Sequence, residues 1–185
     1  MIENVKSSKL KNILKNVFFI WGIICAVVLI YVVAQMAGQL INRDKIDEAT
    51  NDDVEFVLNW SGLGSDRIQG VIHSYYSLMS FTGDHLEAYA IKISDVSLEE
   101  LNKTNDFGRQ WYRGDKLPKN IDDAVSDIGT WESEIKWFPS EEEIRSENIY
   151  VLSESVLYHG VRVVAYKNII IRPSDNMVFY ISTKQ

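Results

Sequence analysis

The run of residues 17–41 constrains this chain most, because it contains no charged side chain and only two strongly polar ones, Gln35 and Gln39. Its 25 residues would form a helix roughly 37 Å long, and the hydrocarbon core of a bilayer is about 30 Å thick. A soluble helix of this length without a polar face would be unusual. We therefore predict a basic tail over residues 1–16, a transmembrane helix over residues 17–41 and one soluble domain over residues 42–185.

The apolar run fits an uncleaved signal anchor better than a cleaved signal peptide. The apolar region of a signal peptide is only about 7–15 residues long. The exit at residues 34–38 also lacks small residues at both positions that a signal peptidase reads. A lipoprotein signal fails as well, because Ile24 stands before Cys25 where a small residue is expected.

Flanking charge predicts the orientation of the anchor. Four lysines precede the helix, whereas only Arg43 and Lys45 closely follow it, among acidic residues. Lys and Arg are retained on the cytoplasmic side during insertion. We expect the N-terminus in the cytoplasm and residues 42–185 outside it, which in a Gram-negative cell means the inner membrane and the periplasm.

The apolar run also contains two pairs of small residues that are four positions apart. Such pairs let two membrane helices approach closely, and glutamine side chains can bond across the interface. A homodimer through this face is one interpretation, and the ordinary abundance of Gly and Ala in membrane helices is the other. The four candidate helix-packing residues are Gly22, Ala26, Ala34 and Gly38.

Charge is distributed unevenly between the two parts of the chain. The net charge is −7, and because residues 1–43 carry +4, the remainder carries −11. An acidic domain without a basic stripe is repelled by phosphate backbones, so nucleic acid is an unfavourable partner. The acidity indicates either solubility alone or a basic protein partner. Cys25 is the only cysteine, so the soluble domain has neither a disulfide framework nor a thiolate nucleophile.

Local signals predict an α+β domain with a mostly antiparallel sheet and a few short helices. Residues 68–81 and 85–93 form a hairpin pattern around Thr82-Gly83-Asp84. The order of elements does not alternate long helices with strands, so we expect the helices at one face of the sheet. Expected helices are 52–60 with Asn51 as its cap, a capping box at 97–100, 120–129 and a second capping box at 140–143; expected strands are 131–137, 149–152, 157–171 and 177–182.

An aromatic segment in the expected loop 105–119 is the candidate partner-binding site. Exposed Trp, Tyr and Arg side chains dominate binding hot spots. The alternative is that Trp111 folds back onto the core. The candidate residues are Trp111, Tyr112, Arg113 and Asp115.

Catalytic and metal-binding motifs are missing from the sequence. The three histidines, at positions 73, 85 and 159, lack the spacing of a zinc site, and no nucleophile elbow or phosphate loop occurs. We therefore predict no metal and no cofactor. An enzyme would need a site assembled from distant residues, and its best starting points are Asp84, His85 and Glu87 at the expected hairpin tip.

The leading hypothesis is a membrane-tethered, non-enzymatic binding module that faces outward. A concrete version is an immunity or inhibitor protein for a basic partner in the envelope, which the acidic surface would steer into contact. The competing hypotheses are an envelope enzyme and a structural subunit of a membrane complex.

Overall fold

The chain divides into two compact units, residues 1–44 and residues 45–185, and each is described by itself. The computed structural model describes residues 2–41, 49–77, 84–102 and 109–185, with side chains in the first helix for residues 14–35 only. The first unit is helix α1, Ile2–Ile41. Within it Leu14–Gln35 is long and apolar enough to cross a membrane, and a signal sequence would pass the same test.

The candidate packing residues in α1 lie on an open helix surface. Gly22, Ala26 and Ala34 are all exposed, and a side-chain carbon added at Gly22 would meet nothing within 4 Å. The surroundings of Gly38 lie outside the described residues. The homodimer through α1 therefore stays a prediction.

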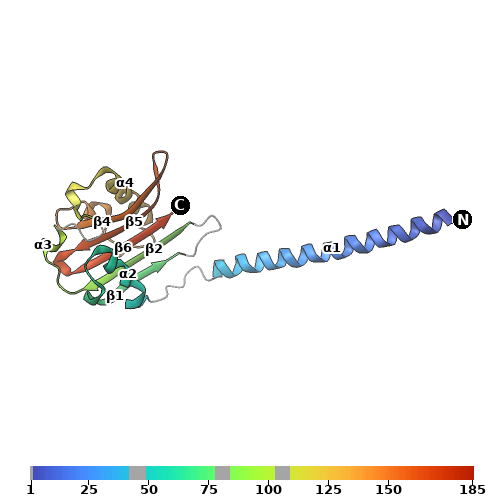
Figure 1. The fold of residues 1–185 in the computed structure, drawn as a ribbon, viewed down its shortest axis with the longest axis horizontal. Coiled ribbons are helices and arrows are strands. Elements are labelled where there is room, and N and C mark those ends of the chain that lie inside the picture. The colour runs from blue at the N-terminus through green and yellow to red at the C-terminus, as the bar shows by residue number, and fades with distance from the viewer. Residues whose placement is uncertain (1, 42–48, 78–83, 103–108) are drawn as a thin grey trace. The chain divides into compact units, whose positions relative to one another are not determined.

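The second unit is built on one six-stranded antiparallel sheet in the order β1-β2-β6-β5-β4-β3 (Figure 1). The last strand, β6, pairs with β2 of the N-terminal hairpin on one side and with β5 on the other, so it joins the two halves of the domain. The predicted α+β class and antiparallel sheet are confirmed. The strands are β1 Ile68–Tyr76, β2 His85–Ile93, β3 Tyr112–Arg113, β4 Tyr150–His159, β5 Arg162–Arg172 and β6 Met177–Lys184.

The sheet is covered on both faces, and the expectation of helices at one face is wrong. Alternate residues of a strand point to opposite faces. In β2, Ala88 and Ala90 belong to one buried cluster, whereas Tyr89 and Ile91 belong to another. Central strands buried on both sides are apolar almost throughout, so their sequence does not reveal the second layer.

The first layer contains helix α2, Asn51–Ser61, and the single turn α3, Leu98–Leu101 (Figure 1). Thr50 rather than Asn51 caps α2, through a capping box with Asp53, and Gly62 ends it in the left-handed conformation at φ +79°. The buried cluster on this face, which we call the α2 core, includes Val54, Val57, Leu58, Leu101, Tyr89, Ile91 and Tyr180.

The second layer contains helix α4, Lys119–Ile128, and the single turn α5, Glu141–Ile144. The predicted strand at 131–137 is wrong, because these residues form a 3-10 turn followed by further turns. Phe138 N–H donates to the Ile135 carbonyl at 2.8 Å, and Ile135 N–H to the Trp131 carbonyl at 3.1 Å. Trp131, Ile135 and Phe138 are spaced four and three residues apart, so turns bring all three onto the buried cluster of this face, the α4 core.

Strands β4 and β5 form a long hairpin whose tip extends beyond the neighbouring strand β6 (Figure 1). The sequence suggested one continuous strand over 157–171, and the structure interrupts it with a turn at Gly160 and Val161. Gly160 has φ +63°, which the first position of a two-residue type II′ hairpin turn requires. β6 ends opposite Ala165, so residues 157–163 of the hairpin extend past the end of β6.

Candidate functional site: an acidic depression beside α5

An open depression of about 660 Å³ lies between the end of α4 and the start of α5. Its lining combines three carboxylates with a single guanidinium, so its net charge is negative. With this balance of charge, the depression could receive a cationic group. The lining residues are Gly129, Glu132, Ser140, Glu141, Glu142 and Arg145.

Local sequence explains why acidic side chains gather at this point. Pro139 precedes Ser140, whose hydroxyl caps α5 by accepting from Glu143 N–H at 3.2 Å. Glu141 and Glu142 occupy the first turn that follows, where negative charge interacts favourably with the backbone N–H groups. The carboxylates of Glu141 and Glu142 therefore line the depression and also stabilise the helical turn α5.

Arg145 is held inside this structure and is not available to neutralise the whole rim. Its Nε donates to Asp122 at 2.8 Å, its Nη2 donates to the Ser126 hydroxyl at 2.7 Å, and it also pairs with Glu141. Hydrogen bonding to Asp122 raises the pKa of the Arg145 guanidinium above its usual value. Glu132 and Glu142 are exposed and form no ion pair among the described residues.

An apolar slot adjoins the base of the depression. It shares Glu132 and Glu141 with the depression and is otherwise closed by Ile128, Ile135 and Phe138. Its free volume of about 10 Å³ is roughly that of one water molecule, so it admits no ligand of its own. Ile128, Ile135 and Phe138 are buried, so they close the base of the depression, and a cationic side chain would meet the polar and acidic rim above them.

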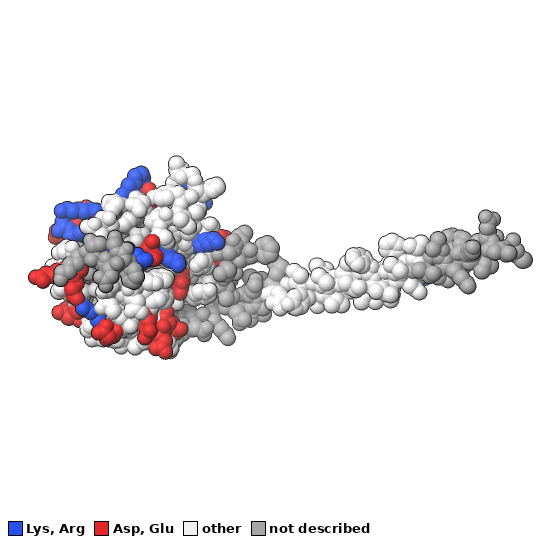
Figure 2. Space-filling model, viewed as in Figure 1, with Lys and Arg blue, Asp and Glu red and all other residues white. Residues whose placement is uncertain are grey.

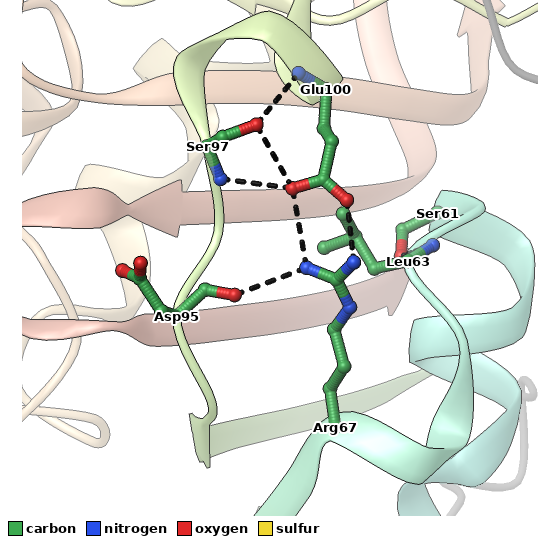
Figure 3. Close-up of polar contacts among 6 residues, drawn as sticks. All are labelled: Ser61, Leu63, Arg67, Asp95, Ser97 and Glu100. Atoms are coloured by element: carbon green, nitrogen blue, oxygen red, sulfur yellow. Dashed lines mark hydrogen bonds and ion pairs between the residues drawn. The ribbon is translucent and has the colours of Figure 1, made fainter.

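A second acidic corner surrounds the ion pair of Arg67 and Glu100 (Figure 3). The guanidinium bonds Glu100 at 2.5 Å and the Asp95 carbonyl at 3.1 Å, while Ser97 N–H donates to the same carboxylate at 2.9 Å. The bond from Arg67 is the main reason that the pKa of Glu100 falls to about 2. These bonds fasten α3 to the start of β1, which is a structural role.

Carboxylates without a cationic partner surround that corner. Asp66, Asp95 and Glu99 are exposed, and Arg67 is already bonded to Glu100. Figure 2 shows acidic clusters at the domain surface in places where basic side chains are absent. This corner provides a control surface that is acidic like the depression.

Among the four candidate partner-binding residues, Trp111 follows the alternative interpretation, in which it folds back onto the core. Trp111 is only 5 % exposed and belongs to the α2 core, so the indole packs onto apolar side chains instead of facing a partner. Tyr112 and Arg113 are half-buried in β3, which pairs with β4. Of the four residues only Asp115 is exposed, and Arg113 bonds it at 2.5 and 2.7 Å, which lowers the pKa of its carboxyl.

Gly114 lets the segment around it pack directly against the backbone that follows α5. A side-chain carbon at Gly114 would stand 1.9 Å from the Ile144 carbonyl oxygen and 2.6 Å from that of Ser146. The backbone here therefore touches the backbone that follows α5, and Gly114 N–H donates to the Ile149 carbonyl at 2.8 Å. The segment supports the wall of the depression from behind instead of presenting an exposed loop.

The starting points of the enzyme hypothesis lie at the beginning of β2. Asp84 and His85 are half-buried and each has an interaction partner. Glu87 accepts a hydrogen bond from the Tyr89 hydroxyl at 2.7 Å, and burial raises the pKa of that hydroxyl. His73 stacks on Trp137 with ring centroids 5.2 Å apart, and His159 stands at the end of β4, so the three histidines lie on separate strands.

Sequence reasoning missed Glu132, Glu142 and Arg145 as one site. It interpreted residues 141–143 as the acidic first turn of a helix, which they are, and it placed Glu132 on the solvent face of a strand that does not form. The density of carboxylates on either side of Pro139 was the available signal.

Comparisons with protein-family models, with curated proteins and with solved structures find no match to this chain. The geometry of its own residues therefore carries the functional argument.

Proposed function

We propose that this chain is a membrane-tethered binding protein whose domain recognises a basic partner outside the cytoplasm. The acidic depression is the observation that carries the proposal. Exposed carboxylates of Glu132 and Glu142 stand at a concave surface of about 660 Å³, and that surface fits the charged end of a lysine or arginine side chain.

The depression supplies both attraction and a defined position. Asp122 and Glu141 satisfy Arg145, so the remaining negative charge is concentrated on Glu132 and Glu142. A concave acidic site in an acidic domain attracts cations from a distance and accelerates their association. The depression has a volume of about 660 Å³, which is enough to receive the charged end of a lysine or arginine side chain.

The tether defines where such a partner would be met. Leu14–Gln35 is the candidate membrane span, and the lysine excess before it favours an outward-facing domain. An immunity or inhibitor protein that neutralises a basic toxin or enzyme of the envelope is the concrete version. A reporter that is active only outside the cytoplasm, fused after Gln185, should give signal, and a cytoplasmic result would contradict this placement.

Charge reversal in the depression provides the test of the binding site. Two forms of the full chain are compared in detergent: Glu132→Lys with Glu142→Lys, and the control Asp66→Lys with Glu99→Lys, which changes net charge equally on the other acidic corner. Both forms are titrated with a lysine-rich peptide and used for cross-linking in cells followed by mass spectrometry.

We expect the depression variant to lose roughly tenfold or more in peptide affinity, since close charge pairs make large contributions to binding. Its stoichiometric cross-linked partner should also disappear, while the control retains both. Equal losses in the two variants would mean that net charge alone acts, and the proposed site would be wrong.

A further inference from the structure

The tip of the β4–β5 hairpin exposes apolar side chains that nothing in the described domain covers. Val161 is fully exposed at 100 %, Leu157 is 58 % exposed and Tyr158 is 41 % exposed. Val161 follows Gly160 in the two-residue turn, so it stands at the outermost point of the hairpin. Single exposed apolar residues are ordinary, but a projecting group of them indicates an interaction surface.

The hairpin also differs in charge from the rest of the domain. Residues 155–174 contain no Asp or Glu, whereas they include Arg162, Lys167 and Arg172 in a domain of strongly negative charge. Arg162 is exposed directly beside Val161; its Nη2 donates to the uncharged side chain of Gln185 at 2.5 Å, and it also interacts electrostatically with the half-buried Asp127. Lys184, at the end of the neighbouring β6, is exposed as well. An apolar tip flanked by cations matches a surface with anionic headgroups above hydrocarbon.

Tyr158 holds the hairpin in its projecting position. Its hydroxyl donates to Asp123 at 3.1 Å and contacts the Asn120 carbonyl at 3.4 Å, both from α4. This contact supports the hairpin from one side, and it leaves the side chains of Leu157 and Val161 exposed and able to contact a membrane.

The connection to α1 reaches the domain beside β1, level with the middle of β2, and the hairpin tip lies toward the end of the sheet where β2 starts. Ala49 N–H donates to the Ser74 hydroxyl at 3.3 Å, and Ser74 pairs with Tyr89, four residues from the start of β2 at His85. The hairpin projects from this end, because His85 pairs with Lys184 and Lys184 with Ala165. Ile41, the last residue of α1, is eight residues before Ala49, which limits their separation to roughly 30 Å.

A strand advances about 3.3 Å per residue, so Val161 and Ala49 are separated by roughly 26 Å along the strand direction. The reach of the connection therefore allows the tip to touch the bilayer that holds α1. A partner that is already tethered needs little affinity to stay bound, because its effective concentration is high.

We propose that the β4–β5 hairpin tip, through Leu157, Val161 and Arg162, docks on the surface of the bilayer that anchors this chain. The proposal rests on the tether of the proposed function and is independent of its basic partner. The hairpin would then orient the domain, with two points of attachment instead of one.

A fluorophore at the tip provides the test in the full chain. In a Cys25→Ser background, Val161→Cys carries an environment-sensitive label, and Ser174→Cys, in the exposed turn between β5 and β6, carries the same label as the matched control. The chains are reconstituted into phosphatidylcholine vesicles with or without phosphatidylglycerol, and flotation of the vesicles checks that α1 is inserted.

The label at position 161 should shift to the blue and be quenched by spin-labelled lipid at least roughly twofold more than the control label. Adding Leu157→Asp should reduce quenching, and adding Arg162→Glu should remove the preference for phosphatidylglycerol. Near-ultraviolet circular dichroism identifies any variant that has lost its fold, and such a variant is replaced by Leu157→Ser or Arg162→Gln.

Identical signals from positions 161 and 174 in floated vesicles would overturn the hairpin proposal and leave the proposed function intact. A tip that responds only when a second protein is added would also overturn it, because the partner would then be that protein. Failure of the chain to float with the vesicles would refute the tether, and both proposals would fall.

Discussion

Residues 119–147 and residues 155–174 pack against each other around the α4 core, yet they have opposite charge. The first segment has nine acidic and three basic residues, and the second has three basic and no acidic ones. Where the two meet, Glu143 pairs with Arg172. The difference teaches that the acidity of this domain is distributed unevenly: residues 119–147 carry a large share of it, whereas residues 155–174 carry none.

The two segments also differ in how tightly they are packed. The wall of the depression is in backbone contact at Gly114, whereas Gly160 of the hairpin has nothing within 4 Å of the position where a side-chain carbon would stand. The depression is therefore a rigid site, and the hairpin tip is free for contact with its surroundings. Three substitutions probe this contrast.

The largest effect should come from Gly114→Ala. The added carbon would lie 1.9 Å from the Ile144 carbonyl oxygen, so backbone must move. We expect a loss of about 3 kcal/mol or more in the free energy of unfolding, measured by urea denaturation of the full chain in detergent with tryptophan fluorescence. Gly160→Ala meets no atom and costs only the left-handed conformation, about 1 kcal/mol. Equal losses at the two glycines would contradict the contrast in packing.

An intermediate effect is expected for Asp127→Asn, at the junction of the two segments. Burial raises the pKa of the Asp127 carboxyl above 3.8, and Arg162 opposes this shift only in part. A raised carboxyl pKa means that the folded state binds the proton more tightly, so ionised Asp127 reduces stability as pH rises above about 4. Asn keeps an oxygen acceptor for Gln185, which donates to Asp127 at 3.1 Å.

The Asp127→Asn chain should therefore be more stable than the wild type at pH 7, by up to about 1 kcal/mol after allowance for solvent screening. The difference should shrink as the pH falls toward 4. Urea midpoints across this pH range measure it. A variant that is less stable at neutral pH, with the deficit unchanged by pH, would show that the carboxylate is a favourable partner of Arg162.

The smallest effect should come from Val161→Asp in detergent. Val161 is fully exposed, so the substitution should change the unfolding free energy by no more than about 0.5 kcal/mol. Val163→Asp, two residues further along in β5, buries a charge in the α4 core and should cost about 3 kcal/mol or more. Thermal unfolding of the two variants side by side measures the difference. A large loss for Val161→Asp would mean that the tip packs on the domain and is not free.

Several features were predictable because their signals are local. The charge-free run before Asn42, the hairpin of β1 and β2, and the capping box at Ser97 each depend on residues within one or two turns of one another. The sequence could also predict the antiparallel sheet, since its strands are joined by short turns. Some element boundaries differ from the prediction by one residue: Thr50, and not Asn51, caps α2.

The remaining features depend on contacts between distant residues. The sequence leaves two interpretations of Trp111 open, an exposed loop residue or a residue folded back onto the core, and the apolar neighbours that the α2 core supplies decide for the second. The alternating pattern from Trp131 to Trp137 is typical of a strand, but with no neighbouring strand to pair with, its apolar residues reach the α4 core through turns. The depression likewise exists only because α5 packs beside the end of α4.

The sequence by itself determined the long apolar helix, the sign of the domain's charge and the class of the sheet, because composition and short-range periodicity decide them. Only the tertiary structure decided that helices cover both faces, that Glu132 and Glu142 share one concave site, and that Leu157 and Val161 project beyond β6. The physical reason is that a side chain's neighbours across the sheet come from chain segments tens of residues away, and no local pattern encodes which segment will cover which face.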